Sequence, residues 1–283
     1  MLRPMMLVRA NKICSYWDSP YANFNYSYVD VAVDQYGFCT IAIDRLGIYP
    51  SSIVADGVNT LQLPLEMAAV YEITTMLRAG TLSNVPDTFN TIVHVGHGFG
   101  ASIIYEMVAQ DPTASDGIVL TGFSQADIFF PLALAGLDSQ LARLNQPLRF
   151  GNESYAAITQ ALLVVGAANN SLAYINEFHP ELDLTLAEVD DALQNLNFLD
   201  LVAGFEGPIL PTTLNLPNDY LTWADIRAFQ FAYFDSGHFD PALLVFLEMT
   251  KQPFTPGELL TFCTGTTTAP DFKGPVLVVT GSE

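Results

Sequence analysis

Two spacings of apolar residues alternate along this chain. Short runs of strand length are separated by segments in which apolar residues recur every three or four positions, as on one face of a helix. The first helical segment stops at Gly37, a natural left-handed cap, and the next one ends before Gly80. This alternation predicts an α/β fold, a doubly wound and mainly parallel sheet of about five strands with helices on both faces. The expected strands are residues 5–8, 38–43, 91–95, 117–122 and 274–281.

The connection between the last two predicted strands is much longer than an ordinary crossover. Its pattern is mostly helical, with capping boxes at Thr185–Glu188 and Thr255–Glu258 and a further helix start at Asp240. We therefore expect a core in residues 1–123, a large helical cap or lid in residues 124–262, and the last core strand in residues 263–283. One helix of this cap is expected to be strongly aromatic, and we interpret its rings mainly as packing. These residues are Trp223, Ile226, Phe229, Phe231, Tyr233 and Phe234.

A glycine-rich turn follows the third predicted strand. Gly96, Gly98 and Gly100 alternate with His97 and Phe99, and a segment of helical spacing begins directly afterwards. This strand–turn–helix pattern has the shape of a nucleophile elbow, Gly-x-Ser-x-Gly, in which a serine stands on a sharp turn above the sheet. Gly98 occupies the serine position, so the elbow carries no nucleophile. A plain turn between a strand and a helix is the alternative interpretation.

The charge and cysteine content of the chain limit the kinds of molecule that it is expected to bind. Thirty acidic and ten basic residues give a formal charge of −20, which opposes binding to nucleic acid and favours solubility. The longest apolar run, residues 161–168, is too short to span a membrane, and the first residues do not resemble a signal peptide. Three acceptor triplets for N-glycosylation leave secretion open. The three cysteines form neither a metal-binding nor a disulfide pattern, so no metal and no cofactor is expected.

Several sequence motifs are distributed along the chain, at residues 16–18, 25–29, 43–52, 95–100, 116–123, 220–223 and 274–281. Together they resemble fungal α/β-hydrolase-fold proteins, over most of the chain except roughly residues 150 to 210. The resemblance implies that the elbow of these proteins reads Gly-His-Ser-Phe-Gly, with Gly98 at the nucleophile position and the Phe99 N–H still placed as an oxyanion donor.

The resemblance also implies where this chain departs from the family. Arg9 and Ala10 stand where the family has a His-Gly oxyanion loop. The acidic residue of the family follows the last predicted strand, where this chain stops at Glu283, and the family's base histidine comes later. Both ends of the fold are accordingly expected to be truncated.

No other triad is evident among the remaining residues. His94 and His97 are interpreted as structural, although His97 belongs to the predicted pocket with Arg9, Ala10 and Phe99. His238 lies in a polar cluster with Asp235 and Ser236, and three near-adjacent residues do not normally form a triad. His179 carries no assignment, and Cys14 is interpreted as a small hydrophobic residue.

Three functional readings follow. The first is a family member without hydrolytic activity that binds a small apolar ligand or a partner in a capped apolar pocket. The second is a carboxylic ester or acyl hydrolase in an inactivated or incomplete form. The third is a non-hydrolytic enzyme, such as a cyclisation or lyase catalyst, that uses the same pocket. Oligomeric state and compartment are not predicted.

Overall fold

A computed structural model describes the chain in two compact units, Met1–Asn145 with Leu216–Glu283, and Gln146–Asn215. The second unit is described only at its two ends. Expectations for residues 152–213, which include His179 and the Thr185–Glu188 capping box, lie outside the described residues. The described residues are 3–9, 16–85, 87–125, 128, 130–151, 214–235, 237–262, 264–266 and 268–281.

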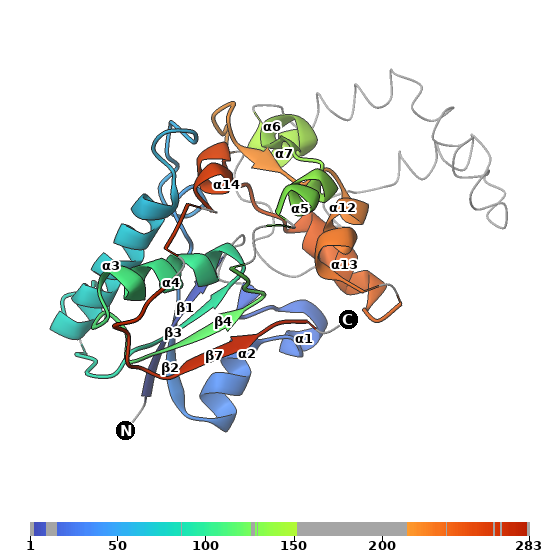
Figure 1. Cartoon of the computed structure of the whole chain (residues 1–283). Coiled ribbons are helices and arrows are strands. Elements are labelled where there is room, and N and C mark those ends of the chain that lie inside the picture. Colours follow the sequence, from blue (N-terminus) through green and yellow to red (C-terminus); the bar gives the residue numbers. More distant parts are fainter. Residues whose placement is uncertain are drawn as a thin grey trace, which may run out of the picture. The chain divides into compact units, whose positions relative to one another are not determined.

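The first unit is built on a five-stranded parallel sheet, which confirms the predicted α/β fold class. The spatial order is β2-β1-β3-β4-β7 (Figure 1). This order places the first strand of the sequence inside the sheet, as in doubly wound folds. The strands are β1 (Arg3–Arg9), β2 (Phe38–Ala42), β3 (Val93–His97), β4 (Gly117–Thr121) and β7 (Val276–Val279).

Side chains alternate between the two faces of the sheet. On β4, Ile118 and Leu120 join the core formed with α3 (Leu63–Ala79) and α4 (Phe99–Gln110), which lie together over one face (Figure 1). Val119, between them in sequence, packs on the opposite face with Val95 and the buried Trp17. The short helices that precede β2 are α1 (Tyr21–Phe24), α2 (Tyr28–Asp30) and the π-helix η2 (Val31–Gln35).

Two expectations about strands need correction. The third strand was expected at residues 91–95, but pairing runs from Val93 to His97, because Gly96 and His97 continue the ladder opposite both neighbouring strands. The last strand was expected to be covered on both faces. Instead, the side chains of Val276–Val279 are 48–55% exposed. β7 is an edge strand, and among the described elements its extensive packing is with β4 rather than with a helix over its faces.

The connection between β4 and β7 is largely helical where it is described. Asp225 and Asp240 accept hydrogen bonds from N–H groups in the first turns of α12 (Ile226–Tyr233) and α13 (Pro241–Met249). The predicted Thr255–Glu258 capping box is present at the start of α14 (Pro256–Phe262): the Thr255 N–H donates to Glu258 Oε2 at 2.7 Å, and the Glu258 N–H donates to Thr255 Oγ1 at 3.3 Å. The elements are α5 (Phe130–Leu137), β5 (Gln140–Leu141), α6 (Ala142–Asn145), α7 (Pro147–Phe150), β6 (Leu221–Thr222), α12 (Ile226–Tyr233), α13 (Pro241–Met249) and α14 (Pro256–Phe262).

The described helices do not include one with the length and apolar character needed to cross a membrane. The aromatic residues predicted to share one helix are divided between α12 and its flanks. Trp223 precedes the helix, and its ring stacks on that of Phe229 with 4.6 Å between centroids. Phe234 follows the helix and packs against Phe239.

Candidate functional site

The chain reverses sharply at Gly98, between β3 and α4. Gly98 has φ 55° and ψ −121°, a backbone conformation that favours glycine. Its N–H donates to the carbonyl of Thr121 at 3.0 Å, and its own carbonyl accepts from the N–H groups of Ala101 and Ser102. The end of β4 and the first turn of α4 therefore hold the turn from both sides.

Gly96 allows the strand and the helix to approach each other closely. A Cβ atom at this position would lie 2.6 Å from the Gly100 carbonyl oxygen and 2.7 Å from the Cα of Ala101. Both neighbours are backbone atoms and cannot move aside cheaply. Glycine is therefore required at the two positions for different physical reasons. At Gly96 the helix backbone leaves no room for a Cβ atom, and at Gly98 the backbone has a positive φ.

A cavity of about 510 Å³ opens beside this turn. A volume of this size is within the usual range for sites that bind small molecules. Apolar side chains from α5, α12 and α14 form most of its wall, and the polar side chains Arg45, His97 and Glu258 contribute to the remainder. The lining residues are Arg45, His97, Gly98, Phe99, Gly122, Phe130, Leu132, Leu134, Leu137, Trp223, Phe231, Ala232, Tyr233, Phe254, Glu258, Leu259 and Phe262.

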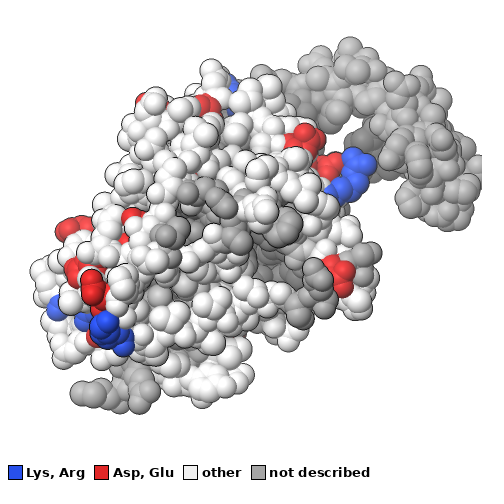
Figure 2. Space-filling view, in the orientation of Figure 1, with Lys and Arg blue, Asp and Glu red and all other residues white. Residues whose placement is uncertain are grey.

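The cavity has an apolar rim. Leu132, Phe231 and Tyr233 line it and are 62%, 64% and 47% exposed. On the face drawn in Figure 2, acidic and basic side chains are sparse among the described residues, and uncharged surface lies between them. These features favour an uncharged, largely apolar occupant over an ionic one.

His97 is fixed against the end of β4. Its Nδ1 lies 3.0 Å from the hydroxyl oxygen of Thr121, and its ring lies beside that of Tyr16, with 5.5 Å between centroids. A Cβ atom at Gly122 would be only 2.8 Å from Cε1 of His97, so glycine at this position makes room for the ring. The imidazole is therefore a positioned part of the cavity wall.

A buried ionic cluster lies at another part of the wall. Nη1 of Arg45 bonds to Oε1 of Glu66 at 2.6 Å and also to Oε1 of Glu258. The guanidinium carbon is 5.0 Å from the centroid of the Phe99 ring. All three charged residues are buried, and the cluster ties the loop after β2 to helices α3 and α14.

Burial changes the proton affinity of this cluster. Desolvation raises the pKa of Glu66 to about 8; the Arg45 charge opposes this rise, and the Glu258 carboxylate adds to it. One guanidinium cannot neutralise two buried carboxylates, so a proton retained on Glu66 brings the cluster to zero net charge.

Sequence reasoning did not identify this cluster. Arg45 received no role, and Glu258 was assigned only to its capping box. The capping box was predicted correctly, and it identifies the Thr255 N–H as the partner of Glu258 Oε2. It gives no information about the partner of Oε1, which is Arg45. Arg45 and Glu258 are 213 residues apart, and no local pattern encodes such a contact.

The other described histidines do not line the cavity. His94 is fully buried, with Nε2 3.0 Å from the Thr74 hydroxyl and Nδ1 2.8 Å from the Ser115 hydroxyl. Desolvation by burial lowers its pKa to about 3, which supports its structural interpretation. His238 is paired with Asp235 at 2.8 Å, and both side chains are largely exposed.

The structure brings three of the predicted site residues together: His97, Gly98 and Phe99 all line the cavity. Arg9 ends β1 and pairs in register with His97, but only its backbone is described. Ala10, Cys14, Ser236 and Glu283 lie outside the described residues, and expectations about them remain predictions. No group of His, Cys, Asp and Glu within the described residues is arranged to hold a metal ion.

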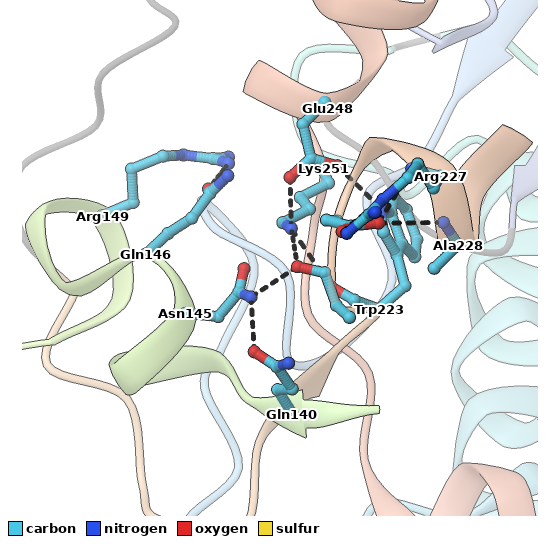
Figure 3. A network of polar contacts seen from close by, with 11 residues as sticks. Gln140, Asn145, Gln146, Arg149, Trp223, Arg227, Ala228, Glu248 and Lys251 are labelled. Atoms are coloured by element: carbon cyan, nitrogen blue, oxygen red, sulfur yellow. Dashed lines mark hydrogen bonds and ion pairs between the residues drawn. The ribbon is translucent and has the colours of Figure 1, made fainter. Parts of the chain in front are cut away.

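Trp223, which lines the cavity, is held by a polar network behind the wall (Figure 3). Its indole N–H donates to Glu248 Oε2 at 3.1 Å, and Glu248 Oε1 accepts from the fully buried Lys251 at 2.5 Å. Lys251 also donates to the carbonyl of Trp223 at 3.1 Å. The network binds both the ring and the backbone of Trp223, so this part of the wall is rigidly placed.

Comparisons with known proteins find solved structures whose fold is similar to that of this chain. Neither a protein-family profile nor a curated protein matches the chain. Solved structures that resemble it include tomato methylketone synthase I in complex with 2-tridecanone, with 10% identity, a TM-score of 0.49, and coverage of 98% of this chain and 78% of that one.

Two further structures are similar in the same way. E-2-(acetamidomethylene)succinate hydrolase has 15% identity and a TM-score of 0.37, with 99% of this chain and 83% of that chain covered. An extracellular α/β-hydrolase from a Paenibacillus species has 17% identity and a TM-score of 0.30, with 54% and 62% covered. These neighbours are α/β-hydrolase-fold proteins, and identities this low concern the fold alone.

Proposed function

We propose that this chain is an α/β-hydrolase-fold protein that binds a small apolar ligand without hydrolysing it through a serine. The observation that carries this proposal is Gly98, which lines a mostly apolar cavity and has φ 55° and ψ −121° at the turn from β3 into α4. A nucleophile elbow holds its serine on such a strained turn. Glycine supplies the turn without supplying an oxygen.

The backbone of the turn supports ligand binding. Phe99 begins α4, and the N–H groups of a first helical turn have no partner within their own helix. In the proposed role, the Phe99 N–H donates to an oxygen of the ligand. The apolar part of the ligand then lies against the aromatic and aliphatic side chains of α5, α12 and α14, in the region that we interpret as the cap.

Burial of the apolar part supplies most of the affinity. Removal of apolar surface from water is worth about 25 cal/mol per Å². An uncharged molecule with a medium-length hydrocarbon chain and one oxygen function satisfies both the wall and the turn. This role does not require a nucleophile, and His97, Gly98 and Phe99 carry neither a hydroxyl nor a thiol group.

A matched pair of tryptophan substitutions tests the proposal. Ala232 on α12 and Ala135 on α5 are both exposed helical alanines, but only Ala232 lines the cavity. Binding of nonan-2-one is measured by isothermal titration calorimetry and by displacement of the neutral fluorescent probe N-phenyl-1-naphthylamine. We expect Ala232→Trp to weaken binding at least about tenfold by filling the cavity, because a lost contact of 1.4 kcal/mol corresponds to that factor.

The control variant Ala135→Trp should bind as the native protein does. The proposal would be overturned if both variants bound the ligand equally well. It would also be overturned if the native chain and both variants showed no saturable binding. Thermal unfolding of each variant establishes that the comparison is made between folded proteins.

A further inference from the structure

A second cavity, of about 330 Å³, shares no lining residue with the first. Two segments of the chain border it, residues 16–28, which include α1, and residues 234–250, which include α13. The side chains of Trp17 and Phe246 are buried in its wall, whereas that of Tyr26 is exposed. The cavity therefore has a buried part and an exposed part, and its volume is sufficient for a small molecule.

Aromatic side chains make up most of this wall. The ring of Trp17 meets those of Tyr16 and Tyr28 edge-on, with 5.1 and 5.4 Å between centroids, so neighbouring rings hold one another in place. Aromatic rings attract cations through the negative potential of their faces, and sites built from several rings bind quaternary ammonium groups. The six aromatic residues are Tyr16, Trp17, Tyr26, Tyr28, Phe234 and Phe246.

The charges of the two bordering segments are negative. The segments contain four carboxylates and neither lysine nor arginine, and Lys251, which follows the second segment, is fully buried in an ion pair. The Tyr21 hydroxyl donates to Oδ2 of Asp240 at 2.6 Å, and the Tyr21 ring lies against those of Tyr26 and Phe246. This hydrogen bond lowers the pKa of Asp240, so the carboxylate is ionised at neutral pH. Asp240 thus fixes a negative charge behind two rings of the wall.

From these observations we infer that the second cavity is a binding site for a small quaternary ammonium compound. Such a cation has no N–H group and needs no hydrogen-bond acceptor, which suits a wall made mainly of rings. Among the described residues, the lining side chains include no charged one that would repel it, and the surrounding carboxylates attract it. The inference is independent of the proposed function, which concerns the first cavity.

The two tryptophans of the chain locate the binding, because Trp223 lines the first cavity and Trp17 lines the second. Their indole N–H signals are recorded by NMR on the nitrogen-labelled chain and assigned with the variant Trp223→Phe. We expect choline to shift the Trp17 signal and leave the Trp223 signal in place, and nonan-2-one to do the reverse. A choline titration that leaves the Trp17 signal unmoved would overturn this inference and leave the proposed function intact.

A neutral probe of the same shape tests the importance of the charge. In 3,3-dimethylbutan-1-ol a carbon atom replaces the charged nitrogen of choline, so the two molecules fill the cavity alike. We expect calorimetry to show at least about fivefold tighter binding of choline. Equal affinities would show that the cavity recognises shape alone, and the inference would be overturned.

Substitutions of one exposed ring test the aromatic contribution. Tyr26→Phe keeps the ring and should bind choline as the native chain does, whereas Tyr26→Leu should bind it about two- to fivefold more weakly. Tyr36→Leu is the matched control, because Tyr36 is also exposed and does not line the cavity. Equal losses in Tyr26→Leu and Tyr36→Leu, or none in either, would contradict recognition by the ring.

Asp240→Asn tests the fixed charge, since asparagine can still cap α13 and accept from Tyr21. We expect this variant to bind choline more weakly and the neutral probe unchanged, while a merely structural role would alter both affinities together.

The same ammonium group occurs in phosphatidylcholine, where a phosphate accompanies it. The carboxylates around the cavity repel that phosphate, so the site is assigned to a free compound. We expect no sedimentation of the chain with phosphatidylcholine vesicles. Sedimentation that free choline reverses would overturn the assignment to a free compound.

Discussion

Arg45 and Glu258 are 213 residues apart in the chain, but Nη1 of Arg45 bonds to the carboxylate of Glu258 in the buried interior. This ion pair joins the loop after β2 to the first turn of α14, which forms part of the cavity wall. Glu66 on α3 shares the same nitrogen. The cavity wall and the sheet core are therefore coupled through one guanidinium group.

Removing that guanidinium should be costly. We predict that Arg45→Met lowers the free energy of unfolding by about 3–5 kcal/mol, because the buried Glu258 carboxylate loses its counter-ion and Glu66 loses its hydrogen-bond donor. Urea denaturation followed by circular dichroism measures the change. Arg227→Met is the matched control: its pair with Asp225 is exposed, so it should cost less than about 1 kcal/mol. Similar losses in the two variants would contradict the role of the buried cluster.

Stability should also depend on pH through Glu66. Burial raises its pKa to about 8, above its ordinary value of 4.5, so the folded chain retains a proton that the unfolded chain releases. The contribution of Glu66 to the free energy of unfolding is greatest at pH values below its pKa in the unfolded chain. It is lost as pH rises through its pKa in the folded chain. We predict that the free energy of unfolding declines between these two values, by up to about 1.4 kcal/mol per pH unit from this site.

Glu66→Gln provides the comparison for this pH dependence. The amide cannot ionise, so the difference in unfolding free energy between variant and native chain should shift in favour of the variant as pH rises across the same window. Urea titrations at several pH values measure this difference. A difference that stays constant, or that changes in the opposite direction, would show that Glu66 does not retain its proton in the folded chain.

Gly98 should resist substitution even by the smallest side chain. At its positive φ, we expect Gly98→Ala to destabilise the fold by about 1–3 kcal/mol through backbone strain. Gly281→Ala is the control, since a Cβ there meets no atom within 4 Å and the backbone is not in the left-handed region. Chemical denaturation of both variants is the measurement, and an unchanged midpoint for Gly98→Ala would refute the strained turn.

Local signals in the sequence predicted the frame of this molecule well. Apolar runs located the strands, Gly37 has the expected left-handed conformation with φ 66°, and the Thr255–Glu258 box starts α14. The end of β3 was placed too early because Gly96 and His97 carry no strand propensity, yet they pair on both sides. Pairing in the sheet overrode local preference there.

The candidate site was predictable only in part, for a physical reason. Gly98 stands out because turn geometry leaves a local mark, a glycine at fixed spacing between a strand and a helix. The Arg45–Glu258 bond and the His97–Thr121 bond leave no such mark. They join segments that become neighbours only after the sheet has formed, so their partners could not be identified from spacing along the chain.

The final prediction concerns a route to serine chemistry. Gly98→Ser would place a hydroxyl at the turn, but a reactive serine needs a base within about 3 Å that is itself oriented by an acid. Among the described histidines, only His97 lines the cavity, and its Nδ1 faces the neutral hydroxyl of Thr121 where a triad has a carboxylate. We therefore expect no labelling of Gly98→Ser by a fluorophosphonate probe at rates typical of serine hydrolases.

The native chain should likewise hydrolyse p-nitrophenyl esters no faster than an unrelated protein, since it has no nucleophile at position 98. In-gel fluorescence and absorbance assays measure the two activities, with a known serine hydrolase as the positive control. Rapid labelling confined to position 98 would show that a base already acts toward that position, and among the described histidines His97 would be the first candidate. The binding role proposed for the cavity would then give way to an enzymatic one.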